Sequence, residues 1–301
     1  MQSGVGAVVV TFFPDPTVLG KLIASLLPQV SAVMIVDNTP GGHLPEHNAA
    51  PAGCTLLRFG ENLGIATAHN AGISWAREQG FEYILLLDQD SITTKGMVKR
   101  LRTAAADMLA QEVPLAAVGP RTVDPRSGAS GYATRITPLG VQRVECAIDD
   151  TKKTIQTDIL VSSGMLIPVS ALDKIGRFEE GLFIDQVDHE WCLRARGLGY
   201  CCFLACDTLL IHQLGTETVR YWLGRWRNAP LHSPMRHYHM LRNTLLLMGR
   251  RYVPAVWSLG ELRRFFSVFV IALSVLPQRR VRLMLMFRAF WHGLMGRSGS
   301  L

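Results

Sequence analysis

The sequence predicts an α/β fold, a mainly parallel sheet flanked by helices, followed by a helical C-terminal region. Apolar runs rich in β-branched residues alternate with helical periodicity through the first half of the chain. Polar residues directly follow two of these runs. After Thr218 the chain has 14 arginines and one acid, so this part carries +13 while the first 218 residues carry −6. We therefore expect a globular domain over 1–218 and a basic amphipathic region over 219–301.

Composition excludes several classes of protein. Of the 301 residues, 48% are apolar and 18% charged, which argues against disorder, a coiled coil or a fibre. The six cysteines form no CxxC pair, so we expect reduced, buried thiols in a cytosolic protein. No positive charge precedes the first apolar run, which argues against a signal peptide and favours a cytoplasmic location.

The first predicted elements alternate between strands, marked by continuous apolar runs, and helices, marked by helical spacing of the apolar residues. Val5–Phe12 is a continuous apolar run, typical of a strand buried on both faces, and Pro16 opens a helix over Thr17–Leu27. The next predicted elements are strands Ala32–Asp37 and Cys54–Phe59, helix Leu63–Gln79, strand Tyr83–Leu87, helix Thr93–Ala110 and strand Leu115–Val118. This repetition predicts a parallel sheet, in which ligands bind at the carboxyl ends of the strands.

The second half is less regular. Residues 120–158 are polar and could hold a short hairpin. The elements expected next are a bent strand or strand pair Ile159–Pro168, helices Ser170–Ile175 and Val187–Arg196, and an extended segment Tyr200–Ile211. From Val219 onward the periodicity predicts only long helices.

Asp88-Gln89-Asp90 follows the apolar strand YILLL. Carboxylates two residues apart in an extended segment point the same way, and such oxygen ligands suit Mg²⁺ or Mn²⁺ bound to a phosphorylated substrate. A turn with solvated acids has the same pattern, so the motif by itself leaves both interpretations open.

Two other segments combine small or acidic residues with a helix start. Asn62–Gly72 is rich in Gly and Ala, which suits either a diphosphate at free backbone N–H groups or tight packing against the sheet. Gly181–Arg194 holds several acids, which the helix dipole also favours, and Glu190 with Arg194 fits an ordinary i,i+4 pair.

Taken in order, these segments resemble a known family. The motifs are VVVTFFP, IVDN, ENLGIATAHNAG, LLLDQD, SSG, FIDQVDHEWCLR and IHQLG. Together they resemble glycosyltransferase family 2, whose members have the GT-A nucleotide-diphospho-sugar transferase fold. Among these the chain is most similar to bacterial rhamnosyltransferases that build surface polysaccharides such as O-antigen. The resemblance spans about Val5 to Leu247.

The resemblance implies an inverting, metal-dependent transfer from a nucleotide-sugar, with Mg²⁺ or Mn²⁺ as the cation. The residues it implies for donor binding are Thr11, Phe12, Asp37, Asn38, Asn62, Gly64, Asn70, Asp88, Gln89, Ser163, Gly164, Arg242 and Asn243. It implies a metal site at Asp88, Asp90 and His212, and Asp188 as the general base.

The chain departs from the family pattern at two places. Where the family often has Glu-Asp-x-Asp, this chain has Val187-Asp188-His189-Glu190, which leaves open whether Glu190 contacts the acceptor. Phe13 stands where many relatives have another residue, so the match at the base pocket is approximate.

The C-terminal region interleaves aromatic residues with arginines, which suits helices in a lipid headgroup layer. We expect a peripheral association with the inner face of the plasma membrane and a saccharide acceptor that is lipid-linked. A helical lid or a homo-oligomer interface would also bury the apolar face. The longest uncharged apolar run, Phe265–Pro277, is short for a membrane span, and no nucleic-acid-binding motif is present.

The resemblance therefore implies transfer of L-rhamnose from dTDP-β-L-rhamnose to a glycan or lipid-linked glycan. The alternatives are the same fold with another donor, such as a UDP-hexose, and a non-catalytic nucleotide-sugar or glycan-binding protein. A dinucleotide-binding oxidoreductase is disfavoured because the first strand is followed by TFFPDP and not by a GxGxxG turn.

Overall fold

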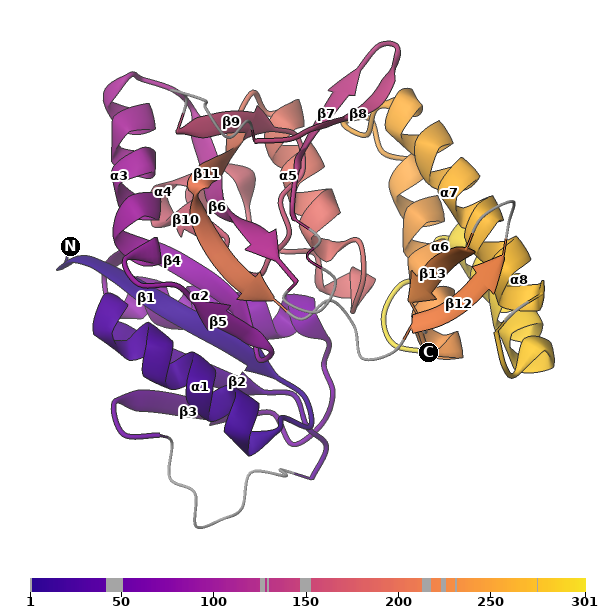
Figure 1. Ribbon diagram of the computed structural model, residues 1–301, viewed down its shortest axis with the longest axis horizontal. Helices are drawn as coiled ribbons and strands as arrows, with labels where there is room; N and C mark the ends of the chain where they lie inside the picture. The colour runs from indigo at the N-terminus through magenta and orange to yellow at the C-terminus, as the bar shows by residue number, and fades with distance from the viewer. Residues whose placement is uncertain are drawn as a thin grey trace.

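The computed structural model describes residues 2–41, 51–124, 128, 130–146, 153–212, 218–222, 226–230, 232–274 and 276–301. Its centre is a nine-stranded sheet of order β3-β2-β1-β4-β10-β6-β11-β5, with β9 paired to β11 outside this order (Figure 1). The strands are β1 Gln2–Thr11, β2 Ala32–Asp37, β3 Cys54–Arg58, β4 Phe81–Asp88, β5 Ser91–Thr93, β6 Leu115–Val123, β9 Thr154–Thr157, β10 Leu166–Pro168 and β11 Cys201–His212.

Parallel pairing dominates this sheet. β1 pairs in parallel with β2 and β4, β2 with β3, and β6 with β11. The short strands β5, β9 and β10 pair antiparallel with their neighbours. The prediction of a mainly parallel α/β sheet is confirmed.

Helices cover both faces of the sheet. They are α1 Pro16–Leu26, α2 Ile65–Glu78, α3 Met97–Ala110, α4 Val169–Ile175 and α5 Val187–Gly197. The side chains of Val8 and Val10 pack in one core with α2, α4 and α5, whereas those of Ala7 and Val9 pack in the other with α1 and α3. Successive side chains of a strand point to opposite faces, so a strand buried on both needs the continuous apolar run seen here.

The polar segment after β6 contains the expected hairpin, formed by β7 Ala133–Thr137 and β8 Gly140–Val144. A second hairpin, β12 Thr218–Trp222 with β13 Trp226–Pro230, corrects the prediction that only helices follow Val219. Thr218–Trp222 alternates and contains β-branched and aromatic residues, which favours a strand, whereas Trp226–Pro230 contains Asn and Pro and forms its strand by pairing with β12.

Three further helices follow, α6 Pro234–Met248, α7 Ala255–Ser274 and α8 Arg279–Leu294. Figure 1 shows them grouped beside the sheet, with α7 next to the β7–β8 hairpin. They share a small core of their own, yet Leu247 and Trp257 pack in the same core as Trp191 of α5. The C-terminal region is thus anchored to the α/β layer, while the boundary after residue 218 stays a prediction. Among the helices that the structure describes, none has both the length and the hydropathy of a membrane span.

Cys146 and Cys206 form a disulfide, with their Cα atoms 5.6 Å apart. The expectation that all six cysteines are reduced is therefore wrong for these two, whereas Cys54, Cys192, Cys201 and Cys202 are free. The two partners are 60 residues apart in sequence. A spacing of that length carries no local signal, so only the fold could reveal the pair.

Candidate active site

The Asp88-Gln89-Asp90 motif lies between β4, which ends at Asp88, and β5, which begins at Ser91. Because β5 pairs antiparallel with the end of β11, Ser91 lies opposite His212. One ligand atom each of Asp88, Asp90 and His212 lies within 4.8 Å of the others. The cluster can hold a divalent cation, since carboxylate oxygens and an imidazole nitrogen are suitable ligands.

Negative charge is concentrated at this cluster. Burial raises the pKa of the Asp88 carboxyl to about 6; the positive charge of His212 opposes the shift, and the carboxylates Asp90 and Asp188 add to it. Arg236 also lowers the pKa of Asp88. A partly desolvated group of like charges is stabilised by a bound cation, so the electrostatics fit a metal site.

Two serines connect the cluster to the centre of the sheet. The Ser91 hydroxyl lies 2.6 Å from that of Ser163 and 3.0 Å from Nδ1 of His212. The backbone N–H of Asp88 donates to the Ser163 oxygen at 3.3 Å. A Cβ on the next residue, Gly164, would lie 2.6 Å from a ring carbon of Pro120, so a glycine is needed for this close approach. The structure thus brings Ser163 and Gly164 to the metal cluster.

The residues expected to hold the nucleotide lie at the carboxyl edge of β1, β2 and β4. One carboxylate oxygen of Asp37 accepts hydrogen bonds from Thr11 and Thr39, while the other is buried and has no partner among the described residues. The Gln89 side chain accepts a hydrogen bond from the Phe12 N–H at 2.7 Å and donates one to the Phe12 carbonyl at 3.1 Å. Phe12 and Phe13 are exposed beside them. This edge of the sheet therefore has one carboxylate oxygen without a hydrogen-bond partner among the described residues, and two exposed aromatic rings.

Asn38, Asn62 and Gly64 hold the turn that enters α2. Asn38 donates to the Gly64 carbonyl and accepts from the Leu63 N–H, and Asn62 accepts from the Gly64 N–H. A Cβ on Gly64, whose φ is +87°, would lie 2.6 Å from the Phe183 carbonyl oxygen. Gly64 is thus required for the approach of α2 to the loop before α5.

Asn70 makes its side-chain hydrogen bonds within the protein. Its side chain is buried, donates to the Phe178 carbonyl and to Glu180, and accepts from the Phe178 N–H. The expectation that Asn70 lines the donor pocket is therefore corrected: it positions the segment before α5. Within Asn62–Gly72 the small residues also serve tight packing, since a Cβ on Gly72 would lie 2.4 Å from a methyl group of Val8.

Asp188 lies in the first turn of α5. Its carboxylate accepts hydrogen bonds from the backbone N–H groups of Ser162 and His189, at 3.3 and 2.9 Å. The loop before it is strained, because Phe183, Asp185 and Gln186 have φ between +62° and +64°. The charge of Asp188 raises the pKa of Asp88, so the expected base lies close enough to the metal cluster for the two charges to interact.

Arg242 and Asn243 hold that strained loop. Arg242 is only 1% exposed and donates to the carbonyl oxygens of Leu182 and Gly299 and to the side chain of Asn243. The Asn243 amide donates to the carbonyls of Leu182, Ile184 and Asp185, each at 2.8 Å. The expectation that this pair contacts the donor diphosphate is corrected, because both side chains are buried and bonded within the protein.

Comparison with known proteins shows the family of this chain. The family described as "Glycosyl transferase family 2" matches residues 7–176. The chain is 31% identical over 279 residues to the dTDP-rhamnosyl transferase RfbF of Shigella flexneri, covering 93% of this chain and 90% of that protein. The chain belongs to glycosyl transferase family 2.

Solved structures agree with the GT-A fold of this glycosyltransferase. A crystal structure of GalNAc-T7 with UDP, GalNAc and Mn²⁺ matches with a TM-score of 0.61 at 13% identity, over 97% of this chain and 56% of that one. The structure of S. aureus TarS 1–349 in complex with UDP-GlcNAc matches with a TM-score of 0.56 at 13% identity, over 97% of this chain and 81% of that one. At these identities the likeness shows the fold alone.

The structure gives roles to two residues of this glycosyltransferase for which the sequence indicated none. Glu190, whose role the sequence left open, is fully buried, pairs with Arg194 at 2.8 Å and accepts a hydrogen bond from Tyr252 at 2.6 Å, so it is structural. Arg236 was missed: it pairs with Asp185 at 3.2 Å and lowers the pKa of Asp88. No local pattern distinguishes Arg236 from its neighbours in PMRHYHMLR, since only the packing of α6 brings it to the site.

Proposed function

We propose that this glycosyltransferase transfers L-rhamnose from dTDP-β-L-rhamnose to a saccharide, with inversion, in surface polysaccharide synthesis. The match to a dTDP-rhamnosyl transferase over 93% of the chain supports the donor and the pathway. The observation that carries the chemistry is the cluster of Asp88, Asp90 and His212 at the carboxyl edge of the sheet. These are the groups that a diphosphate-bound cation requires.

For the donor, we assign the base to the edge formed by Thr11, Phe12 and Asp37. The unpartnered oxygen of Asp37 is an acceptor for the N3–H of thymine or uracil, and Phe12 offers an exposed ring. We assign the diphosphate to the side of Asp88 and Asp90. Arg236, whose positive charge lowers the pKa of Asp88, takes the place expected for Arg242 beside the diphosphate.

The reaction is one in-line displacement. The acceptor hydroxyl oxygen bonds to the anomeric carbon of the sugar, and the bond from that carbon to the diphosphate oxygen breaks. Asp188 takes the hydroxyl proton, and dTDP leaves with the electron pair. Asp88, Asp90 and His212 would hold Mg²⁺ or Mn²⁺, which stabilises the charge that develops on the leaving diphosphate. No covalent enzyme intermediate is needed.

We further propose that the acceptor is lipid-linked and that the enzyme works at the inner face of the plasma membrane. Exposed apolar side chains on α7 and α8 support this, among them Phe266, Phe287 and Trp291, with exposed arginines on the same helices. Co-flotation with anionic vesicles but not with zwitterionic ones is the expected result. Dimerisation in solution without vesicle binding would assign these helices to a homo-oligomer interface instead.

The donor assignment is tested by release of the nucleotide diphosphate without an acceptor. dTDP-rhamnose and a panel of UDP-hexoses are each incubated with the enzyme and Mg²⁺, Mn²⁺ or EDTA. We expect slow, cation-dependent release of dTDP from dTDP-rhamnose only. Release of UDP from a UDP-hexose instead would support the glycosyl transfer reaction but show that the donor is not dTDP-rhamnose. No release and no donor binding in any condition would contradict the proposed function.

A further inference from the structure

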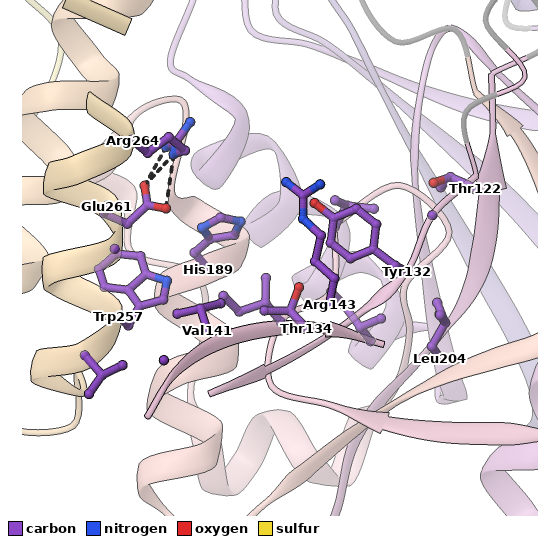
Figure 2. Close-up of a pocket in the computed structure, with 18 of the residues that line it drawn as sticks. Thr122, Tyr132, Thr134, Val141, Arg143, His189, Leu204, Trp257, Glu261 and Arg264 are labelled. Atoms are coloured by element: carbon purple, nitrogen blue, oxygen red, sulfur yellow. Dashed lines mark hydrogen bonds and ion pairs between the residues drawn. The ribbon is translucent and has the colours of Figure 1, made fainter. Parts of the chain in front are cut away.

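A cavity of about 1140 Å³ lies between the β7–β8 hairpin, the start of α5 and α7. Figure 2 shows Glu261 and Arg264 of α7 at one side, Tyr132 and Arg143 at another, and His189 between them. Ser163, which bonds to the metal cluster through Ser91, also lines the cavity. The cavity therefore begins next to the reaction centre, where His189 directly follows the proposed base.

Glu261 is the principal fixed acceptor group in this cavity. It is the single acid of the chain after Thr218, and its side chain is 13% exposed. Arg264 donates to both carboxylate oxygens at 3.1 Å, and the Gln186 side chain donates to one of them at 3.0 Å. One oxygen, Oε2, also accepts from Arg264 Nη2 and has no acceptor capacity left, whereas Oε1 accepts only from Arg264 Nε among the described residues and keeps a lone pair for a ligand.

The remaining lining combines polar and apolar surfaces. Nδ1 of His189 is buried and has no partner in the described part of the chain. Tyr132 is 38% exposed and carries the Arg143 guanidinium 4.5 Å from its ring centroid. Leu139, at the tip of the hairpin, is 95% exposed at the rim. A ligand that suits such a lining has hydroxyl groups on its edge and C–H groups on its faces, as a pyranose ring has.

We propose that this cavity binds the acceptor saccharide, with Glu261 accepting hydrogen bonds from its hydroxyl groups and Tyr132 packing against a sugar ring. The proposal rests on the proposed function, since it supplies the second substrate of that reaction. The volume exceeds that of ordinary small-ligand pockets, so the cavity has room for more than one ring. Tyr132 lies within residues 7–176 and Glu261 outside them, so part of the acceptor recognition would come from the chain beyond the family match.

Binding of defined glycosides tests this without knowledge of the natural acceptor. The probes are the methyl glycosides of L-rhamnose, D-glucose, D-galactose and N-acetyl-D-glucosamine, observed by saturation-transfer NMR on the full chain. The variants are Glu261→Gln, Tyr132→Ala and Tyr132→Phe. Glu78→Gln is the matched control, because Glu78 is an exposed acid on α2, outside the cavity lining. Circular dichroism checks that each variant is folded.

We expect at least one glycoside to bind the wild type and Glu78→Gln equally. Glu261→Gln and Tyr132→Ala should weaken that binding about tenfold, and Tyr132→Phe should restore it, because the ring is kept. Unchanged binding in Glu261→Gln and Tyr132→Ala, or no binding of any glycoside to the wild type, would overturn the proposal. Acceptor-free dTDP release by the wild type is measured in parallel, so failure of the donor assignment is seen separately.

Discussion

Asn243 donates its side-chain amide to the backbone oxygen of Leu182 at 2.8 Å, and thereby ties α6 to the loop before the proposed base. The same nitrogen reaches the carbonyls of Ile184 and Asp185. Two residues of this loop, Asp185 and Gln186, have left-handed backbone conformations that need external support. The C-terminal region therefore contributes to the geometry of the active site.

Replacement of Asn243 by Ala should damage both stability and catalysis. The change leaves buried carbonyls without donors, and we expect a loss of about 2 kcal/mol in the free energy of unfolding. The transfer rate should fall at least tenfold while the KM for the donor changes little, because the loop positions the start of α5, where the proposed base lies. Denaturant unfolding and initial rates measure the two effects. Leu198→Ala, at an exposed position, is the control; a stable and fully active Asn243→Ala enzyme would refute the positioning role.

Replacement of Asp188 by Asn should abolish transfer and leave donor binding nearly intact. The amide keeps the size of the side chain but cannot take the hydroxyl proton. Turnover is measured with dTDP-rhamnose, and donor affinity by calorimetry with dTDP and Mn²⁺. Retained turnover together with lost donor affinity would assign Asp188 to binding instead of proton transfer.

Cation binding should weaken as the pH falls through about 6, because that is the pKa to which burial raises the Asp88 carboxyl and the protonated form is a poor ligand. Calorimetric titration of Mn²⁺ between about pH 5 and pH 8 measures this. A flat affinity over that range would contradict the role of Asp88.

The same shift predicts a change in the stability of the cation-free protein. The folded-state pKa of Asp88 is raised above its ordinary value of 3.8, so the folded state binds its proton more tightly than the unfolded state. The destabilising effect of the charged group is therefore fully present above about pH 6 and is lost as the pH falls toward 3.8. Asp88→Asn should raise the Tm of the cation-free protein at pH 8 and change it little at pH 4. An equal effect at both pH values would contradict the shift.

Thiol titration should find four reactive groups in the denatured, unreduced protein and six after reduction, because Cys146 and Cys206 form a disulfide. Disulfides are rare in cytosolic proteins. Six thiols in protein isolated under thiol-trapping conditions would show that the pair is reduced in the cell and would contradict the disulfide. Cys146→Ser should abolish the difference between the two titrations.

Apart from the short strand β5, Ser91–Thr93, which was not expected, the order of strands and helices through β6 could be predicted because it depends on local patterns. Continuous apolar runs such as Val5–Phe12 and the turn residues between them require a sheet covered on both faces. Asp88 and Asp90 were identifiable as a possible cation site, since they are neighbours in sequence and follow a strand. The alternation of Thr218–Trp222 was also a local signal for a strand, although the arginine-rich context obscured it.

Side-chain partners distant in sequence were decided only by the tertiary structure. Arg242 and Arg236 lie on the same helix, but the packing of α6 buries the first against the Leu182 carbonyl and brings the second to Asp185. The disulfide and the position of Glu261 in the cavity depend on contacts of the same kind. The sequence by itself determined the fold class and the family, because local periodicity and short motifs carry both. Long-range packing decides which charged side chains lie at the reaction centre and which bond to the backbone. Only the tertiary structure shows this.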